Sequence, residues 1–500
     1  MSNKKGVNVK NKEQDNRNER TRNVGTNVSN EEEMLYQREL EQVTLENTEI
    51  DWKPPEVVSD IDRCIKIVDK LTRSKVIAVD AEGVNLGKDG PMTLLQVGTL
   101  EGDLYLFDIH SNTKLFEQGK LKVLLQSGDI VKVIHSCSGD SAALYYQFGI
   151  QLENVFDTQI AHLVIEEHKG RKLPSAQKLC EICKIYSSQA NVSDQKETLK
   201  NRWMKEEGEL WAERPLTDEM IEYASGDIKA LIPEVYLNQK MFLDQNGLRL
   251  IFNERVQEEV NFHIVDTVKQ RRNNRVEKTA KTILAEFETK YSQDISLNLI
   301  TDNDDLKALN IIRFDTPGMS PMVKRLKKEY IQMEMKHLRD QLNEEGNNFI
   351  PKVRSFGYLR AYEHYTDDSE IQREAKSLRQ NIDSIVLQDI ITKYTDNTKH
   401  SILKQYEKEA LRSLRPASEH DENFHQLHLA LYWQLQEDEI DATIAQFERD
   451  GKMYSIPEGK YKWLKFVRST NVYPKKIQDK VKKHLQNLDR MFGKNKCPNP

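Results

Sequence analysis

The 500-residue sequence has no apolar run that approaches the roughly 20 residues needed to span a membrane. Its first residues, MSNKKGVNVKNKEQDN, are polar and lack the apolar segment of a signal peptide. Cysteine is scarce, and its five occurrences form an odd-numbered, sparse set, which favours free thiols in a reducing compartment over a disulfide framework. These absences predict a cytoplasmic or nuclear protein that is neither secreted nor inserted in a membrane.

The chain also lacks a large excess of charge, but its charge is unevenly placed. Residues 458–500 contain twelve Lys or Arg against three Asp or Glu, a net +9, which leaves −15 for the rest of a chain whose total is −6. A basic tail on an acidic body favours a localised anionic partner such as nucleic acid. A solvated tail that has no partner fits the same charges equally well.

Five hundred residues exceed the size of a single core, since cores stop growing at about 250–300 residues. Residues 1–48 are polar and are expected to be disordered, because they cannot bury enough apolar surface to offset the entropy of ordering. Residues 49–247 alternate short apolar runs with helical patterns, whereas 248–415 consist of charged amphipathic helices. We expect a third unit at 416–468 and a basic tail at 469–500.

Five apolar segments in the first domain predict strands: Val76–Asp80, Thr93–Val97, Leu104–Phe107, Val131–His135 and Val155–Phe156. Short glycine-containing links join the first three, which favours an antiparallel meander. Helices are expected at 112–126, before the fourth strand, and at 217–246. This order predicts an α/β domain with a mixed sheet, followed by a mostly α-helical C-terminal region.

Two acids, Asp80 and Glu82, end the first predicted strand. Side chains two positions apart on a strand share a face, so these carboxylates repel each other unless a cation lies between them. Oxygen ligands of this kind suit Mg²⁺ or Mn²⁺. Taken alone the pair is weak evidence, because strands often end in Asp.

Two further segments place acids near predicted helices. Asp140 follows the fourth strand and opens a helix, where an ordinary N-terminal acid would also be stabilised by the helix dipole. Tyr223 and Asp227 lie four positions apart and therefore share a helix face, as an ordinary surface pair would. Each segment is ordinary alone, and their order along the chain carries the information.

In that order the segments resemble the ribonuclease D-like 3′–5′ exonucleases of the DEDDy family, which have a ribonuclease H-like fold. The matching segments are Asp80 and Glu82 with Leu94-Leu-Gln-Val97, His135 to Asp140, Val155–Ile160, and Tyr223 with Asp227 preceded by Trp211-Ala-Glu-Arg-Pro-Leu216. The Glu82-Gly-Val-Asn-Leu86 variant is most similar to the exonuclease 3′–5′ domain-containing proteins, which include Egalitarian. The resemblance covers about 195 residues, and all four acids and the tyrosine are present.

The resemblance implies metal-dependent hydrolysis of phosphodiester bonds from the 3′ end of a single strand, with two Mg²⁺ or Mn²⁺ ions. Asp80 would bridge both ions, Glu82 and Asp227 would hold the ion that activates water, and Asp140 would serve the second ion. Tyr223 would position the attacking water.

Two residues are expected beside the substrate. Leu94 would wedge the terminal base, although a place in the buried strand core is as compatible with its neighbours. His135 would lie at the end of its strand, near the substrate.

The resemblance leaves three functions open. An RNA exonuclease is favoured, with RNA a better candidate than DNA as the single-stranded partner. The subgroup also contains RNA-binding adaptors that lack part of the acid set, and the complete set here speaks against that function. A DNA exonuclease has the same fold. The helical C-terminal region is a candidate surface for protein partners.

Three other patterns have plain structural interpretations. Residues 427–464 combine an amphipathic helix, an Asp-Gly turn and aromatic segments, which resembles the end of a winged helix but would fit any helix followed by a hairpin. Asp157 is expected to cap a helix rather than to join the acid set. Cys180 and Cys183 form a CxxC without the second ligand pair of a zinc site, so we expect them in a helix core.

Overall fold

The computed structural model describes residues 50–187, 209–393 and 474–492, with short gaps at 85, 89, 315, 347–348, 350–352 and 365–367 and isolated residues between 436 and 467. The chain divides into two units, residues 1–52 and 53–500. Every helix and strand of the described residues belongs to the second unit. The predicted disorder of residues 1–48 lies outside the described residues.

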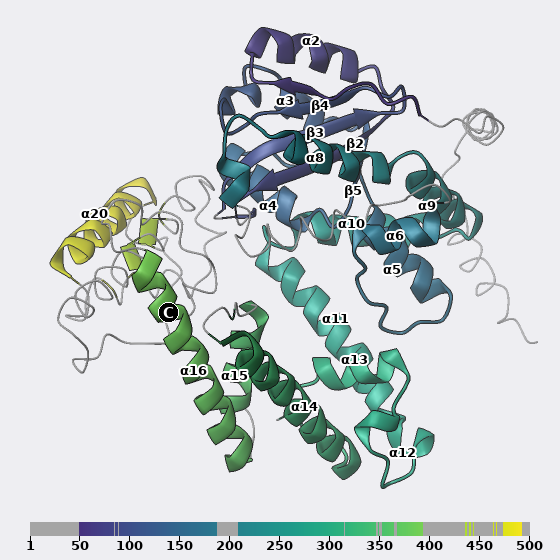
Figure 1. Cartoon of the computed structure of the whole chain (residues 1–500), viewed down its shortest axis with the longest axis vertical. Coiled ribbons are helices and arrows are strands. Elements are labelled where there is room, and N and C mark those ends of the chain that lie inside the picture. The colour runs from purple at the N-terminus through teal and green to yellow at the C-terminus, as the bar shows by residue number, and fades with distance from the viewer. Residues whose placement is uncertain are drawn as a thin grey trace, which may run out of the picture. The chain divides into compact units, whose positions relative to one another are not determined.

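A six-stranded mixed sheet is the centre of the first domain (Figure 1). Its strands in spatial order are β1 (Glu56–Val58), β4 (Leu104–Phe107), β3 (Met92–Thr99), β2 (Val76–Gly83), β5 (Val131–Ile134) and β6 (Val155–Asp157). Strands β2, β3 and β4 form the antiparallel meander, while β5 and β6 continue the sheet parallel to β2. The predicted α/β class and mixed sheet are confirmed.

Sequence patterns located five of the six strands and missed β1. This strand has only three residues, too few to show an alternating pattern, and it pairs in parallel with β4 at the edge of the sheet. Antiparallel links are short because consecutive strands reverse direction, whereas β2 and β5 run parallel and need a crossover between them.

Two predicted helices are each divided. The segment 112–126 forms a 3₁₀ turn, η1 (Thr113–Leu115), and a short helix, α3 (Leu121–Leu125), because Lys120 between them has a left-handed backbone conformation, with φ of 67°, that a right-handed helix cannot contain. The segment 217–246 forms α8 (Asp218–Leu231) and α9 (Glu234–Gln245), since Pro233 has no N–H group to continue a helix.

Helices pack on the sheet and lead from it into the C-terminal region. They are α2 (Ile61–Leu71), α4 (Ser138–Phe148), α5 (Thr158–His168), α6 (Leu179–Tyr186) and α10 (Arg249–Asn261), in addition to α8 and α9. Helix α8 packs across β2, β3 and β4, while α10 packs against α4, α5 and β6 (Figure 1). In α6, Ile182 and Cys183 are fully buried and contact Val235, so the expected helix-core role of the CxxC segment is confirmed for Cys183.

The described residues after α10 form helices almost throughout, as predicted. They are α11 (Asp266–Ala285), α12 (Phe287–Lys290), α13 (Asn303–Ile311), α14 (Pro321–Glu345), α15 (Val353–His364) and α16 (Ser369–Lys393), with a 3₁₀ turn, η3 (Leu297–Leu299). One apolar cluster joins α11, α13 and the start of α14, and a second joins the rest of α14 to α15 and α16. These clusters explain why such a charged sequence folds here: each helix buries one apolar stripe.

The basic tail contains a helix, α20 (Lys475–Phe492). Its residues Ile477, Val481 and Leu485, spaced four apart, are all buried. The stretch that resembles a winged helix, 416–468, lies outside the described residues except for a few isolated positions. Of the helices that the structure describes, none has the length and apolar content that crossing a bilayer requires.

Candidate active site

Strand β2 carries two of the predicted metal ligands at its end. Asp80 and Glu82 stand on one face of the strand, opposite Gln96 and Leu94 of β3 in the antiparallel register. The register shifts directly after Glu82, at Gly83. A Cβ atom on Gly83 would lie only 2.2 Å from the carbonyl oxygen of Pro91, so only glycine allows the two backbones to approach this closely.

Helix α8 carries the third motif. Thr217 caps its N-terminus by accepting a hydrogen bond from the backbone N–H of Met220. Every third or fourth residue from Met220 to Leu231 is buried, and this stripe packs on the sheet. Tyr223 and Asp227 flank the stripe one turn apart, so packing of α8 on β2 brings both toward the sheet.

The three carboxylates Asp80, Glu82 and Asp227 meet. Each offers an oxygen atom, and these atoms all lie within 4.8 Å of one another. All three side chains are half-buried, so they are open to a ligand but partly shielded from water. Three like charges at this separation repel strongly in a partly desolvated site, and an ion of opposite charge removes that cost.

The chemistry of this donor set fits a hard divalent cation, because every ligand atom is a carboxylate oxygen. Gln96, which pairs with Asp80 across the sheet, is an independent indication of a polar ligand. Its side chain is fully buried, yet neither its amide nitrogen nor its amide oxygen hydrogen-bonds to any described residue. Buried amides normally have partners, so a bound polar group on this face would complete the site.

Asp140 lies in the first turn of α4 and is half-buried. It is not a member of the group of three acids whose oxygens lie within 4.8 Å of one another. Burial raises the pKa of its carboxyl to about 7; a backbone hydrogen bond opposes this, and the nearby Asp157 carboxylate adds to it. The structure therefore brings three of the four predicted ligands together, while the role of Asp140 at a second ion stays a prediction.

Asp157 has a larger structural role than the predicted cap. As expected, its side chain accepts hydrogen bonds from the backbone N–H groups of Gln159 and Ile160 at the start of α5, at 2.9 and 3.1 Å. It also accepts bonds from Ser136 and Cys137, at 3.1 and 2.8 Å. Those two residues form the turn that leads from β5 into α4, so one buried carboxylate fixes the backbone that presents Asp140.

The hydroxyl of Tyr223 is held in its protonated form. Burial is the main reason that its pKa lies well above the usual value, and the carboxylates of Asp227, Glu82 and Asp80 raise it further. A neutral phenol beside three carboxylates can donate a hydrogen bond, but it cannot serve as a base at neutral pH. This electrostatic setting fits the predicted positioning role of Tyr223.

Arg214 also belongs to this site. It lies in the Trp211–Leu216 segment that precedes the third motif, but the sequence alone led us to assign it no role. Its guanidinium donates to the Asp108 carboxylate after β4 and to the backbone carbonyl oxygens of Thr93, Trp211 and Glu213, at 2.7 to 3.0 Å. These contacts connect the segment before α8 to strands β3 and β4. The signal that could have revealed this role was the unusual Trp-x-x-Arg-Pro spacing before the third motif.

The two residues predicted beside the substrate have well-defined surroundings. Leu94 is fully buried opposite Glu82, as its alternative role in the strand core requires, and its wedge role stays a prediction. His135 bonds through Nε2 to the carbonyl oxygen of Gln177, at 3.2 Å, and through Nδ1 to the hydroxyl of Thr158, at 2.9 Å. Because a carbonyl only accepts, Nε2 donates the first bond. His135 thus anchors the chain after α5 to the end of β5.

A cluster of carboxylates on the central strand of a mixed sheet, completed by a Tyr-x-x-x-Asp helix, defines a nuclease-type domain. Residues 55–242 match the protein-family model described as 3′–5′ exonuclease. This part of the chain is accordingly similar to 3′–5′ exonuclease domains.

Its relatives include EXD1 and Egalitarian. The chain is 32% identical over 170 residues to the piRNA biogenesis protein EXD1 of Xenopus laevis, a match that covers 33% of this chain and 37% of that protein. It is 32% identical over 99 residues to the Egalitarian protein homolog of Caenorhabditis elegans, covering 20% of this chain and 17% of the relative. The chain thus spans only about a third or less of these relatives' length.

Among solved structures, the ribonuclease D of Trypanosoma brucei in complex with GMP is similar, with 26% identity and a TM-score of 0.32. That match covers 36% of this chain and 55% of the other chain.

Proposed function

We propose that this protein is a metal-dependent exonuclease that removes nucleotides from the 3′ end of single-stranded RNA. The meeting of the Asp80, Glu82 and Asp227 carboxylates, from a strand and a helix that lie far apart in the sequence, is the observation that carries this proposal. Relatives named for piRNA biogenesis support RNA as the substrate class.

Two Mg²⁺ or Mn²⁺ ions, when bound, would supply an activated water and neutralise charge on the scissile phosphate. Asp80, Glu82 and Asp227 would hold them, with Asp140 serving the second ion. The chain itself contributes orientation. Tyr223 keeps its proton and offers it as a hydrogen bond to the attacking water. Arg214 and Asp157 hold the backbone segments that carry the ligands.

Purified full-length protein, incubated with Mg²⁺ or Mn²⁺ and 5′-labelled single-stranded RNA or DNA, tests the proposal. We expect a ladder of RNA products shortened one nucleotide at a time, and none in EDTA or with Asp80→Asn. RNA binding without cleavage by the intact protein would instead identify a non-catalytic adaptor. Faster cleavage of DNA than of RNA would overturn the choice of substrate.

A further inference from the structure

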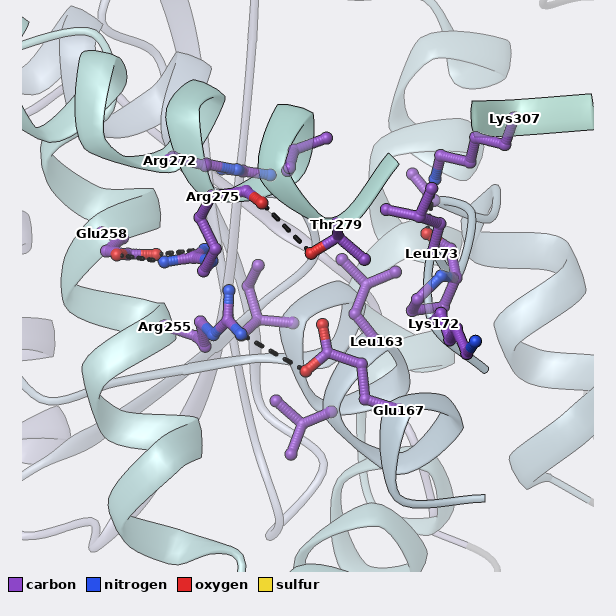
Figure 2. Close-up of a pocket in the computed structure, with 15 residues that line it drawn as sticks. Leu163, Glu167, Lys172, Leu173, Arg255, Glu258, Arg272, Arg275, Thr279 and Lys307 are labelled. Carbon is purple, nitrogen blue, oxygen red and sulfur yellow. Dashed lines mark hydrogen bonds and ion pairs between the residues drawn. The ribbon is translucent and has the colours of Figure 1, made fainter. Parts of the chain in front are cut away.

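A separate cavity lies where the exonuclease domain meets the helical region. It has a volume of about 370 Å³, is open to solvent, and is lined by α5 and the chain after it, by α10 and α11, and by Lys307 of α13 (Figure 2). This volume is within the range of small-molecule sites, about 300–1,000 Å³. None of the five predicted catalytic residues lines it.

Positive charge predominates in the lining. Its charged residues are Lys172, Arg255, Arg272, Arg275 and Lys307, against the carboxylates of Glu167 and Glu258. Figure 2 shows the arginines on one side of the cavity and both lysines on the other. On the lysine side, Lys172 pairs with Glu286, which does not line the cavity, so Lys307 is the main source of positive charge there.

All three arginines are held by carboxylates, Arg272 by Glu259, but keep donors in reserve. Arg275 forms a two-bonded pair with Glu258, at 2.6 and 2.7 Å, which fixes the plane of its guanidinium. Arg255 reaches Glu167 through a single long contact of 3.4 Å. A guanidinium has five N–H donors, so these contacts with Glu258 and Glu167 use only a minority of them. Held in this way, the arginines are preorganised for an anion.

The opposite side of the cavity carries a lysine that is partly shielded from water, Lys307. Burial is the main cause that lowers the pKa of Lys307, and the charges of Arg171 and Arg272 lower it further, while Asp304 acts in the other direction. The Nζ atom of Lys307 donates to the Pro174 carbonyl oxygen, at 2.5 Å, and this contact supplies no negative charge. An anion in the cavity would relieve the repulsion.

The remaining wall is apolar. Ile160, Leu163 and Val164 of α5 line the cavity together with Leu173 and Val276. An inorganic anion would leave this surface unused, whereas a ligand with a flat ring and a phosphate would use both the wall and the arginines.

We propose that this cavity binds a nucleotide, with its phosphate at Arg255, Arg272 and Arg275 and its base against Leu163 and Leu173. The nucleotide is either a free mononucleotide or one unit of an RNA strand, since both present the same base and phosphate. Binding would connect α5 of the exonuclease domain to α11 of the helical region, and would stabilise that junction by mass action. The site is independent of the proposed hydrolysis.

Equilibrium titration of the full-length protein with AMP, inorganic phosphate, adenosine and a short RNA tests this site. EDTA is present throughout, so that metal at the acid cluster cannot hold a phosphate. The test variant is Arg255→Gln, on α10. The control is Lys281→Gln, which also removes one positive charge, but from α11 and at a position that does not line the cavity. AMP or RNA affinity should fall about 10- to 100-fold in Arg255→Gln only, as expected for loss of a charged hydrogen-bond donor.

The titrations with AMP and with RNA distinguish a free nucleotide from a unit of an RNA strand, and the full set can overturn the proposal. A loss of AMP affinity in Arg255→Gln identifies a free nucleotide as the ligand. A loss of RNA affinity alone identifies a unit of the strand. Either result supports the site. Inorganic phosphate binding as tightly as AMP would refute a nucleotide site, as would equal affinities of Arg255→Gln and Lys281→Gln for every ligand. If Arg255→Gln does not fold, Lys307→Met, on the opposite wall, replaces it in the same comparison.

Discussion

The guanidinium of Arg214 and the carboxylate of Asp108 form an ion pair with an Nη2–Oδ1 distance of 2.6 Å, in which both side chains are largely shielded from water. Burial alone would raise the pKa of Asp108, but hydrogen bonds from Arg214 and Ser111 outweigh it and hold the pKa below its usual value. The pair joins the backbone ahead of α8 to the end of β4. Since α8 carries Tyr223 and Asp227, this contact ties the third motif to the sheet that carries the first.

Replacement of Arg214 by Gln should lower the free energy of unfolding by about 3 kcal/mol, because it leaves the Asp108 carboxylate buried without its partner. Chemical denaturation measures the loss. The double variant with Asp108→Asn should lose less than the two single variants combined. Arg63→Gln is the matched control: its pair with Glu56 is exposed to solvent, so its loss should change the unfolding free energy little. Equal losses at both arginines would contradict a special role for Arg214.

Asp227→Asn should abolish hydrolysis and weaken Mn²⁺ binding while the domain stays folded, since an amide is a poor substitute for a charged ligand. Removal of one of three mutually repelling carboxylates should also keep or raise the metal-free melting temperature. Calorimetric titration with Mn²⁺, a nuclease assay and thermal unfolding provide the three readouts. Turnover equal to that of wild type at saturating metal would refute the assignment of Asp227.

Tyr223→Phe should slow hydrolysis by about 10- to 1000-fold yet spare Mn²⁺ affinity, because it removes one hydroxyl and preserves the ring packing. Tyr223 lies 6.0 Å from the Trp211 ring, centroid to centroid, and phenylalanine keeps that contact. The measurement is single-turnover cleavage alongside Mn²⁺ titration. A collapse of metal affinity would show that the tyrosine supports the ligands rather than the water.

The lysines of α20 differ in their surroundings, which sharpens a test of the basic tail. Lys482 and Lys483 are exposed, whereas Lys476 and Lys480 form ion pairs with Glu437. If the tail neutralises phosphates, Lys482→Gln with Lys483→Gln should weaken RNA binding across sequences. The slope of log affinity against log salt should become shallower by up to about 0.7 for each contact.

Lys476→Gln is the control on the same helix, and it should change that slope less. Equal slopes for wild type and the double variant would favour a solvated or protein-docking tail. Point variants are preferable to truncation after Thr470, because truncation would also remove the buried residues Ile477, Val481 and Leu485.

Lys327 provides a pH-dependent test of the helical region. Burial lowers its pKa to about 8, partly opposed by the charge of Glu334, while its Nζ donates to the carbonyl oxygens of Leu309 and Asn310. A lysine with a lowered folded-state pKa releases its proton sooner in the folded protein. Its contribution to stability therefore grows as pH rises from about 8 toward the unfolded value near 10.5.

Urea denaturation at several pH values, with Lys327→Met for comparison, measures this effect. As pH rises across that range, the unfolding free energy of wild type should increase relative to that of the variant by about 2–3 kcal/mol. Lys324→Met, on the exposed side of α14, should show no such shift. A constant difference for Lys327→Met would contradict a lowered pKa.

Much of the fold could be read from the sequence because its signals are local. Five strands were located from short apolar runs, and the cap at Asp157 from its place before a helical pattern. The edge strand β1 was missed because it is only three residues long, and its pairing with β4 is a long-range contact. The division of the 112–126 helix was missed because it occurs at Lys120, whose left-handed backbone conformation is unusual for a lysine.

The order of residues along the chain dictates which groups this protein can use. Asp80, Glu82, Asp140, Tyr223 and Asp227 stand in a recognisable order, because the chemistry requires those residue types at those element ends. Which of them meet depends on long-range packing. Helix α8 lies across β2 and brings Asp227 to Asp80 and Glu82, and this packing leaves Asp140 outside the group. The arginine-lined cavity also exists only in the folded chain, since its walls come from segments more than 100 residues apart, from Ile160 to Lys307.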